Sequence, residues 1–529
     1  LPSENMRADN RSLFRALDVT DHARLRVLML VSEAVPFSKT GGLADVSSAL
    51  SVSIAKLGHA VTVILPRYRE SDGVGKAAGR CVVRVGGLAY DVGLFEASLG
   101  DGVRAVLLDC PSLYDRDGLY GDSQGEYSDN PIRFSVLVRA ALDLAAGAEL
   151  APSVIHAHDW QAGLTPVYLS ARVPKYRCLQ ATASVLTIHN LAYQGTFSEN
   201  CLDTIGLSGD PSLRGAMKHG AGVSFLKGGI VLSDAVTTVS PRYAEEIVGV
   251  ELGRGLDASL RSRGTRLTGI LNGVDDAVWN PESDPFLPMP FSTVNLGGKL
   301  AAKRAMLQRY GLPTDDVALA RPVVGMVSRL VPQKGLDLIV EVADELLALD
   351  LAFVVLGTGR AEYQDLWREL SARHPDRVGA YIGFDEERAH LIEGGADLFL
   401  MPSRYEPCGL NQMYSLRYGT VPIVRATGGL ADSVEPYNGT TGKGNGFAFR
   451  DYSGAALLAS LQEALTLFKD RDAWRRLQIA GMSQDNSWSV SAREYVKVYR
   501  KACNDAEKRV SGSGEQQGIG SAAADIRPV

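Results

Sequence analysis

The amino-acid sequence predicts an α/β protein with two parallel-sheet domains, and three observations support this. Short apolar, β-branched runs alternate with helix-length amphipathic stretches from about residue 26 to residue 480. The same alternation starts again near residue 323, and one hexapeptide occurs once in each half of the chain. Such alternation is typical of a parallel sheet, because each helix carries the chain back to the end where the next strand starts.

The expected strands form two series. The first covers 25–31, 60–65, 105–108, 154–157, 185–188 and 235–239, with helices at 45–57 and 131–144 between them. The second covers 323–327, 353–356, 378–382, 398–401 and 421–424. Continuous apolar runs of this length indicate strands that are buried on both faces. Two separate series favour two Rossmann-like domains over the alternative, one long α/β barrel.

Composition narrows the classes of function. The 529 residues are 45% hydrophobic and 22% charged, and 61 acidic against 55 basic residues give a net charge of −6 without a basic stripe. We therefore expect no nucleic-acid partner and a neutral or small anionic substrate. No uncharged apolar run approaches the ~20 residues of a membrane span, so we expect a soluble protein. The sequence carries no signal for an oligomeric state.

The N-terminal residues and the cysteines bear on location. The chain begins at Leu1 without a methionine, so we expect that an upstream segment was removed or omitted. Residues 1–24 lack the apolar core of a signal peptide, and the six cysteines are scattered without a CxxC pair. We expect free thiols in the cytoplasm, or in a plastid stroma if a transit peptide was removed. The eight histidines include no HExxH, and we predict no metal site.

The repeated hexapeptide Thr-Gly-Gly-Leu-Ala-Asp occurs at 40–45 and at 427–432. Each copy is expected where an extended segment gives way to a helix, so that paired glycines let a ligand approach positively polarised N–H groups. Lys39, directly before the first copy, can compensate phosphate charge, although the GxxxxGK[ST] order of an ATP-hydrolysing P-loop is absent. Two unrelated structural turns are the alternative. One copy in each half favours a cleft with a glycine-rich loop on each wall.

Two loops that follow strands of the second series carry charged residues. Arg329 and Lys334 follow the strand at 323–327 in Val-Ser-Arg-Leu-Val-Pro-Gln-Lys-Gly, and a guanidinium with an ammonium suits a diphosphate. Glu406 follows the strand at 398–401, where a fixed carboxylate can accept hydrogen bonds from sugar hydroxyls. The alternatives are a solvated loop with ordinary cations and a structural turn with a solvated glutamate.

The turn after Glu406 contributes further candidates. The amides of Gly409 and Leu410 precede the expected helix at 411–418, where they can meet a phosphate. Cys408 lies between them and Glu406, and we interpret it as a packing thiol rather than a nucleophile. We include all three among the substrate-binding residues.

Polar and aromatic side chains follow two strands of the first series. The segments His-Ala-His-Asp-Trp and Thr-Ile-His-Asn-Leu-Ala-Tyr-Gln-Gly place His158, Asp159 and His189 at one edge of a parallel sheet. A satisfied core histidine is the alternative for each one alone, but clustering favours a site. Trp160 and Tyr193 offer flat faces for sugar rings. Tyr114 completes the expected substrate-binding set.

Taken in order and spacing, several of these strings resemble one family. KTGGLADV, HAHDW, TIHNLAYQG, LNGVD, VSRLVPQKGLDLI and SRYEPCGLNQMYSLRYGT are similar to bacterial glycogen synthases and plant starch synthases, over roughly residues 26–505. The resemblance implies a GT-B fold, ADP-glucose (UDP-glucose in some members) as donor, an α-1,4-glucan acceptor and retention of the anomeric configuration. It implies no cofactor, since the nucleotide sugar is a substrate.

The resemblance also implies residue roles. In the first half, Lys39 with Gly41 and Gly42 faces the phosphates and glucose, Asp45 binds near the nucleotide, and Asp159 and His189 hold the glucose. In the second half, Asn272 lies at the domain junction, Arg329 and Lys334 neutralise the diphosphate, and Glu406 orients the sugar. Phe384 stands where the family often has a tyrosine that stacks on adenine. We group the catalytic residues as Glu406, His189, Lys334, Arg329 and Asp159.

With this resemblance we divide the chain into five parts. They are an extension at 1–24, an acceptor-side domain at 25–268, a nucleotide-sugar domain at 269–486, a helix at 487–505 that packs back on the first domain, and a disordered tail at 506–529.

Distant retaining relatives carry a second glutamate where this chain has Tyr414, so a covalent intermediate is disfavoured and front-face attack is favoured. Another GT-B transferase that makes sucrose or a small glucoside, a phosphorylase and a non-catalytic glucan scaffold are the alternatives. The scaffold would lack some of Lys39, Arg329, Lys334 and Glu406, and all four are present.

Overall fold

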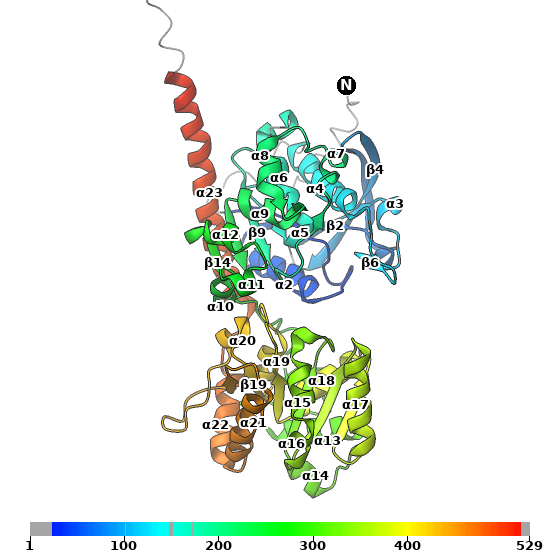
Figure 1. Cartoon of the computed structure of the whole chain (residues 1–529), viewed down its shortest axis with the longest axis vertical. Coiled ribbons are helices and arrows are strands. Elements are labelled where there is room, and N and C mark those ends of the chain that lie inside the picture. The colour runs from blue at the N-terminus through cyan, green and yellow to red at the C-terminus, as the bar shows by residue number, and fades with distance from the viewer. Residues whose placement is uncertain (1–23, 101, 148–151, 172, 520–529) are drawn as a thin grey trace, which may run out of the picture. The chain divides into compact units, whose positions relative to one another are not determined.

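The computed structural model describes residues 24–100, 102–147, 152–171 and 173–519. This chain divides into two compact units (Figure 1). The first contains the described parts of Leu1–Val239, Ala244–Ile270 and Trp488–Val529, and the second contains Ser240–Tyr243 and Leu271–Ser487. The polypeptide therefore passes between the units more than once, and its last long helix belongs to the first unit.

The first unit is built on a sheet with the strand order β14-β13-β9-β8-β1-β2-β5-β4-β3, nine strands in the described residues. Seven of them are parallel: β1 (Arg26–Leu30), β2 (Ala60–Pro66), β5 (Val103–Asp109), β8 (Val154–His158), β9 (Ala183–Ile188), β13 (Ala235–Thr238) and β14 (Leu267–Gly269). β1 lies between β2 and β8, with Val27 opposite both Val61 and Val154. All six strands expected for this half are present. The β1 end where the chain enters the first glycine-rich loop is therefore buried in the middle of the sheet.

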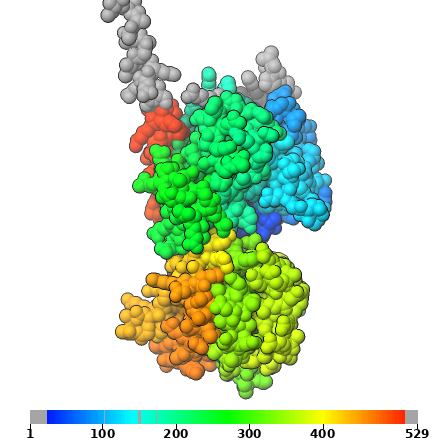
Figure 2. Space-filling view, in the orientation of Figure 1, coloured from blue at the N-terminus to red at the C-terminus, as the bar shows by residue number. Residues whose placement is uncertain are grey.

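The other two strands form an antiparallel hairpin, β3 (Lys76–Val85) and β4 (Leu88–Gly100), seen in blue at one flank of the first unit (Figures 1 and 2). The expectation of a purely parallel sheet was wrong here. Along β3, exposed Arg80, Val82 and Arg84 alternate with buried Val83 and Val85. That period of two belongs to a strand with one solvated face, and it lacks the continuous apolar run that marked the other strands.

Helices cover the first sheet. They are α2 (Gly42–Lys56), α3 (Pro111–Tyr114), α4 (Asn130–Gly147), α5 (Asp159–Ala162), α6 (Leu164–Ser170), α7 (Cys201–Thr204), α8 (Pro211–Met217), α9 (Phe225–Leu232), α11 (Val250–Gly253), α12 (Asp257–Arg261) and α23 (Trp488–Ile519), while α10 (Pro241–Glu246) begins in the second unit. Val46, Leu50 and Ile54 of α2 recur at every fourth position and are buried. A small sheet of β10 (Thr196–Phe197), β12 (Gly222–Ser224) and β11 (Lys218–His219) and the pair β6 (Gly121–Asp122) and β7 (Gly125–Glu126) complete the unit.

α23, red in Figure 1, corrects the expected disordered tail. Its residues 506–519 are helical, while 520–529 lie outside the described residues. Tyr495, Tyr499, Ala502 and Ala506 keep a spacing of four, three and four, and all are buried against the first unit. Composition alone predicted a disordered tail from residue 506, but the buried stripe includes Ala506 and the helix runs on beyond it.

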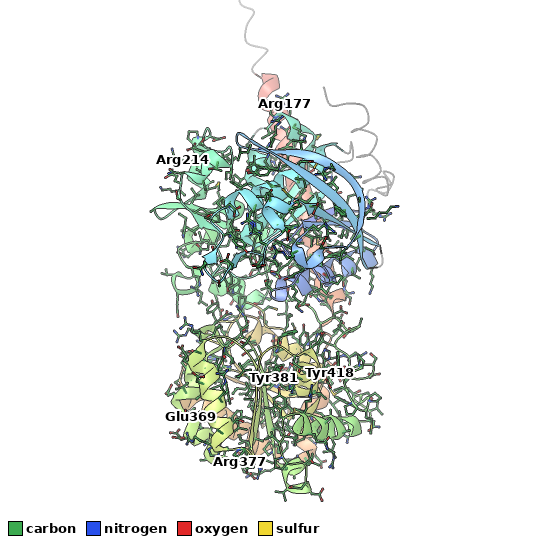
Figure 3. All side chains as sticks on the ribbon, turned by 90° about the vertical axis from the view of Figure 1, so that its right-hand side faces the viewer. Arg177, Arg214, Glu369, Arg377, Tyr381 and Tyr418 are labelled. Carbon is green, nitrogen blue, oxygen red and sulfur yellow. The ribbon has the colours of Figure 1, made fainter. Side chains whose placement is uncertain are left out.

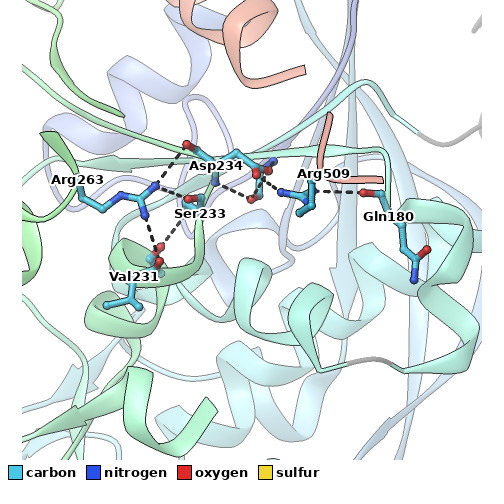
Figure 4. Close-up of polar contacts among 8 residues, drawn as sticks. Gln180, Val231, Ser233, Asp234, Arg263 and Arg509 are labelled. Atoms are coloured by element: carbon cyan, nitrogen blue, oxygen red, sulfur yellow. Dashed lines mark hydrogen bonds and ion pairs between the residues drawn. The ribbon is translucent and has the colours of Figure 1, made fainter. Parts of the chain in front are cut away.

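An ion pair extends the attachment of α23. The Arg509 guanidinium donates to the buried carboxylate of Asp234 and to the carbonyl of Gln180 (Figure 4). Asp234 also accepts from the N–H and hydroxyl of Ser184 at 2.8 and 3.0 Å. Arg263 approaches the same segment and donates to the carbonyls of Val231 and Ser233. The last part of the helix is thereby tied to the segment before β13.

The second unit contains a parallel sheet with the order β17-β16-β15-β18-β19-β20, six strands in its described residues. The strands are β15 (Val323–Val327), β16 (Ala352–Gly357), β17 (Val378–Ile382), β18 (Leu398–Met401), β19 (Val421–Arg425) and β20 (Phe447–Phe449). Three of the five expected strands match to the residue, and the sheet is open, which excludes the barrel. Val354 and Val355 belong to different apolar clusters, so the sheet is covered on both faces.

The helices of the second unit are α13 (Gly297–Arg309), α14 (Asp316–Ala320), α15 (Leu336–Glu341), α16 (Ala343–Ala348), α17 (Ala361–Arg373), α18 (Glu386–Gly395), α19 (Asn411–Arg417), α20 (Gly428–Ser433), α21 (Gly454–Phe468) and α22 (Arg471–Met482). Tyr418, labelled in Figure 3, lies at the end of α19 and donates to Asp284 at 2.6 Å. Over the described ranges, none of the helices has both the length and the apolar run that crossing a membrane requires.

Candidate active site

A buried carboxylate organises the first glycine-rich loop. Glu33 follows β1 and is 3% exposed. It accepts from the N–H of Thr40 at 2.5 Å, from the N–H of Gly41 at 3.3 Å and from the hydroxyl of Tyr120 at 2.6 Å. The loop is thus fixed by an anion at the start of α2, where the helix dipole favours negative charge. Glu33 was not among the site residues selected from the sequence.

The loop's own charged residues pair with each other. Lys39 Nζ lies 2.7 Å from Asp45 Oδ1, and both side chains are partly exposed, at 49% and 35%. Gly41 has open space where a side chain would be, since no heavy atom lies within 4 Å of the position that a Cβ would take, and Gly42 begins α2. The backbone of this loop is therefore approachable, and Lys39 is accessible to an anion that competes with Asp45.

The second copy of the hexapeptide has a different role. A Cβ on Gly428 would lie 1.9 Å from the Glu406 carbonyl oxygen, and one on Gly429 would lie 2.1 Å from that of Cys408. These glycines let α20 pack against the loop that carries Glu406. Both copies do begin helices, as expected, but the second serves close packing.

At the ends of β8 and β9, Asp159 holds the backbone of the neighbouring loop. Its Oδ1 accepts from the N–H of His189 at 2.7 Å, and the N–H of Asn190 also donates to the carboxylate. Asp159 is 7% exposed and adopts a left-handed backbone with φ of 55°. Burial raises the pKa of Asp159 to about 7, because desolvation outweighs the two hydrogen bonds that stabilise its charged form.

Three histidines cluster behind this edge. His158 Nδ1 lies 2.9 Å from His189 Nε2, while His156 contacts the hydroxyl of Thr187 at 2.6 Å and that of Tyr499, on α23, at 2.8 Å. Burial lowers the pKa of His156 and of His189 to about 3, and it lowers the pKa of His158 well below its usual value. All three rings are therefore neutral at pH 7.

Two expected substrate-binding aromatics belong to the core instead. Tyr114 is fully buried, and its hydroxyl donates to the carbonyl of Arg133 at 2.8 Å. Trp160 is 5% exposed and packs edge-to-face on Phe134, with ring centroids 4.9 Å apart. Their faces are occupied by protein, so the expectation for both was wrong. Tyr193 is 50% exposed and keeps a free face for a ligand.

In the second unit, Lys334 and Glu406 form an ion pair. Lys334 Nζ lies 2.6 Å from Glu406 Oε2, and the side chains are 18% and 8% exposed. The hydroxyl of Ser403 donates to the same oxygen at 2.9 Å. Arg329, exposed beside them, is in reach of the Gln333 side chain at 3.4 Å. The structure therefore brings together the two loops that sequence analysis selected, with Ser403 as a partner that it missed.

The turn after Glu406 is tightly packed. Cys408 is 5% exposed, the backbone N–H of Asn272 donates to its sulfur, and burial raises the pKa of its thiol to about 12, so it is a packing group. Gly409 has a φ of 71°, where a side chain would be strained, and Leu410 caps α19. Asn272 is 5% exposed, and its Oδ1 is buried without a partner among the described residues.

Comparison with known proteins decides the family. Residues 26–262 match the starch synthase catalytic domain, and residues 316–477 match glycosyl transferases group 1. The chain is 45% identical over 485 residues to the glycogen synthase of Koribacter versatilis, covering 90% of this chain and 98% of the relative. It is 47% identical over 481 residues to that of Anaeromyxobacter sp. strain Fw109-5, with 90% and 99% coverage.

The chain belongs to the glycogen and starch synthase family. It also resembles the catalytic domain of starch synthase IV from Arabidopsis thaliana bound to ADP and acarbose, with a TM-score of 0.83, 35% identity, and coverage of 91% of this chain and 100% of that one. The sucrose-phosphate synthase of Thermosynechococcus elongatus shares the fold at a TM-score of 0.58 and 18% identity, covering 90% and 99%. As a member of this synthase family, the chain is a glucosyltransferase with the GT-B fold.

The structure locates the two residues, Tyr414 and Phe384, at which this sequence departs from related enzymes. Tyr414 lies on α19 and stacks on Trp279 with ring centroids 4.0 Å apart, and the other face of Trp279 stacks on His390 at 3.9 Å. Tyr414 therefore packs this helix against α18. Phe384, after β17, is 82% exposed, so its ring is available to a ligand. No group of three or more His, Cys, Asp or Glu suited to a metal occurs among the described residues.

Proposed function

We propose that this synthase transfers glucose from ADP-glucose to the non-reducing end of an α-1,4-glucan, with retention of the anomeric configuration and without a cofactor. The observation that carries the proposal is the Lys334–Glu406 pair at 2.6 Å, with Ser403 on the same carboxylate oxygen. This arrangement supplies a cation for a leaving diphosphate directly beside a carboxylate for the sugar. The names of the bacterial relatives, and the ADP and acarbose bound to the plant starch synthase, support these substrates.

The two oxygens of Glu406 take separate parts in this proposal. Among the described residues, both Lys334 and Ser403 donate to Oε2, which leaves Oε1 to accept from a sugar hydroxyl. Arg329 is exposed and always charged, so it can bind the diphosphate in a bidentate manner. Lys334 then stabilises both the Glu406 carboxylate and the diphosphate. Its charge offsets the negative charge that develops on ADP as the bond between glucose and the diphosphate breaks.

Residues of the first unit would hold the glucose and the phosphates. Lys39 exchanges Asp45 for a phosphate, and the amides near Gly41 lie on a loop that Glu33 already fixes. His189 is neutral and therefore binds a sugar hydroxyl without repelling the positive charge that builds up on the ring. Tyr193 offers an apolar face to a glucan unit, and Phe384 offers one to adenine.

The chemistry follows from these charges. Tyr414 replaces the second carboxylate of distant relatives, and it packs on Trp279, so no nucleophile stands at that position. We propose front-face attack, in which the acceptor 4-hydroxyl gives its proton to the departing phosphate oxygen as the new bond forms on the same face. The protein's part is electrostatic, and a cytoplasmic location remains part of the proposal.

The experiment uses the purified full chain with labelled ADP-glucose and glycogen. We expect label in lengthened α-1,4 chains that β-amylase releases as maltose. A parallel reaction with UDP-glucose measures donor choice, and we expect it to be slower. Transfer only to a monosaccharide, or label in chains that only a β-glucosidase releases, would contradict the proposal.

A further inference from the structure

A hydrogen bond joins the imidazole rings of His158 and His189. His158, the last residue of β8, is fully buried, and its Nδ1 lies 2.9 Å from Nε2 of His189, which follows β9 and is half-buried. The rings are nearly parallel, at 22° with centroids 5.2 Å apart. Because a nitrogen–nitrogen hydrogen bond needs one donor and one acceptor, only two neutral arrangements satisfy it.

The far nitrogen of His158 distinguishes the two arrangements. Its Nε2 is buried and has no hydrogen-bond partner among the described residues. If His189 were the donor, His158 would carry its own proton on Nε2, and a buried N–H would be left without an acceptor. If His158 Nδ1 is the donor, Nε2 is only an unused acceptor. Orphaned buried N–H groups are the rarer and more costly case, so the second arrangement is favoured.

We propose that His158 is a positioning residue that holds His189 in the tautomer with its proton on Nδ1. The inference rests on the proposed function and makes it more specific. His189 then presents an N–H donor to the substrate, so it binds an oxygen lone pair of the sugar rather than accepting a hydroxyl proton. Among the described residues Nδ1 has no hydrogen-bond partner of its own. His189 therefore acts neither as a general base nor as a proton carrier.

The neighbouring residue completes the positioning. Asp159 fixes the backbone N–H of His189 at 2.7 Å, while His158 fixes the ring. His158 and Asp159, at the end of β8, thus set both the tautomer and the position of the His189 ring on the loop after β9. His156, two residues earlier, differs because Thr187 and Tyr499 occupy both of its ring nitrogens.

The test is a long-range ¹H–¹⁵N spectrum of the full chain labelled on histidine, at pH 7. His189→Gln identifies the signals of His189. We expect a protonated Nδ1 and an unprotonated Nε2. The opposite pattern, or an averaged mixture of tautomers, would overturn the proposal. Because this readout uses the unaltered protein, it does not depend on whether a variant folds.

Variants provide the functional readout. His158→Leu should release the tautomer of His189 and lower kcat roughly tenfold, with KM for ADP-glucose changed less than about twofold. His158→Asn, whose amide can donate from the position of Nδ1, should restore the Nδ1–H tautomer and most of kcat. Tyr499→Phe removes a partner of His156 only and should leave the His189 signals unchanged. Unchanged His189 signals in His158→Leu would refute the role of His158.

Different results would contradict the proposed function and the proposed role of His158. A protein with the expected His189 tautomer but no transfer from ADP-glucose to glucan would contradict the proposed function. An active synthase with the opposite tautomer would contradict only the role of His158.

Discussion

Lys334 Nζ lies 2.6 Å from Glu406 Oε2, and this contact joins the loop after β15 to the loop after β18. Adjacent parallel strands end at the same edge, so residues 72 apart in sequence meet there. The carboxylate is 8% exposed; the ammonium of Lys334 balances its charge, and the hydroxyl of Ser403 donates a hydrogen bond to it. The pair is therefore both a structural contact and the centre of the proposed chemistry.

Lys334→Met should lower stability and activity together. It leaves Glu406 buried without its cation, and we expect a loss of roughly 1–3 kcal/mol, less than a fully buried pair because Lys334 is 18% exposed. Activity should fall because the leaving diphosphate loses a cation. Denaturant unfolding and the initial rate of glucosyl transfer measure the two effects.

Arg329→Met is the matched control for stability in that experiment. It removes the same charge from an exposed side chain on the same loop, so its free energy of unfolding should change by less than about 0.5 kcal/mol, although activity should fall. Equal destabilisation by both substitutions would show that the Lys334–Glu406 contact contributes nothing specific.

Asp159 should make stability depend on pH. Its folded pKa is raised to about 7, while an unfolded aspartate has a pKa of about 3.9, so between these values the folded protein holds a proton that the unfolded chain has lost. This contribution is fully present below pH 4 and is lost as pH rises through 7. Relative to Asp159→Asn, the unaltered protein should gain stability at pH 5 compared with pH 8. A difference between the two proteins that is the same at both pH values would refute the raised pKa.

Glu33→Gln should weaken donor binding. The neutral glutamine oxygen accepts more weakly than the carboxylate from the N–H groups of Thr40 and Gly41, so the glycine-rich loop is held less firmly. We expect KM for ADP-glucose to rise by roughly tenfold, with a smaller change in kcat. Tyr120→Phe removes one donor and keeps the loop amides bound to Glu33, so its effect on KM should be smaller. A larger effect in Tyr120→Phe than in Glu33→Gln would contradict this explanation.

Arg509→Met should loosen the end of α23. The carboxylate of Asp234 keeps two bonds from Ser184 but loses its cation, and Arg509 is 50% exposed, so we expect a loss of about 1 kcal/mol and a fall in Tm of about 2–4 °C. Lys508→Met removes a neighbouring exposed charge and should leave Tm unchanged. Equal Tm values for Arg509→Met and the unaltered protein would show that the Arg509–Asp234 ion pair adds nothing to stability.

The sequence predicted the parallel strands well because each is a continuous apolar run, as in Val323–Val327 and Leu398–Met401. It missed the β3–β4 hairpin because β3 is buried only on alternate residues near its end, and Arg80 and Arg84 interrupt its apolar run. The tail prediction failed because composition alone does not reveal that Ala506 continues a buried stripe on α23. Local pattern thus identifies elements, while their length depends on tertiary contacts.

In the candidate site, too, the sequence predicted some features and others depended on tertiary contacts. Glu406 and Lys334 could be selected because polar residues after buried strands gather at one sheet edge. Their contact with each other, and the hydrogen bond from Ser403, depend on how the two loops fold and have no signal in the sequence. Trp160 looked like a sugar platform by residue type, yet Phe134 covers it. Residue type indicates what a side chain can do, and packing decides whether a ligand can reach it.

The most direct measurement is the rate of glucosyl transfer from ADP-glucose to glycogen by the unaltered chain and by Glu406→Gln, with circular dichroism as the check on folding. Gln keeps the shape of the side chain and removes the charge that Lys334 and Ser403 stabilise. We predict that the unaltered chain lengthens the glucan and that the folded variant loses at least about 100-fold in kcat. A folded Glu406→Gln protein that transfers glucose at the full rate would contradict the central claim.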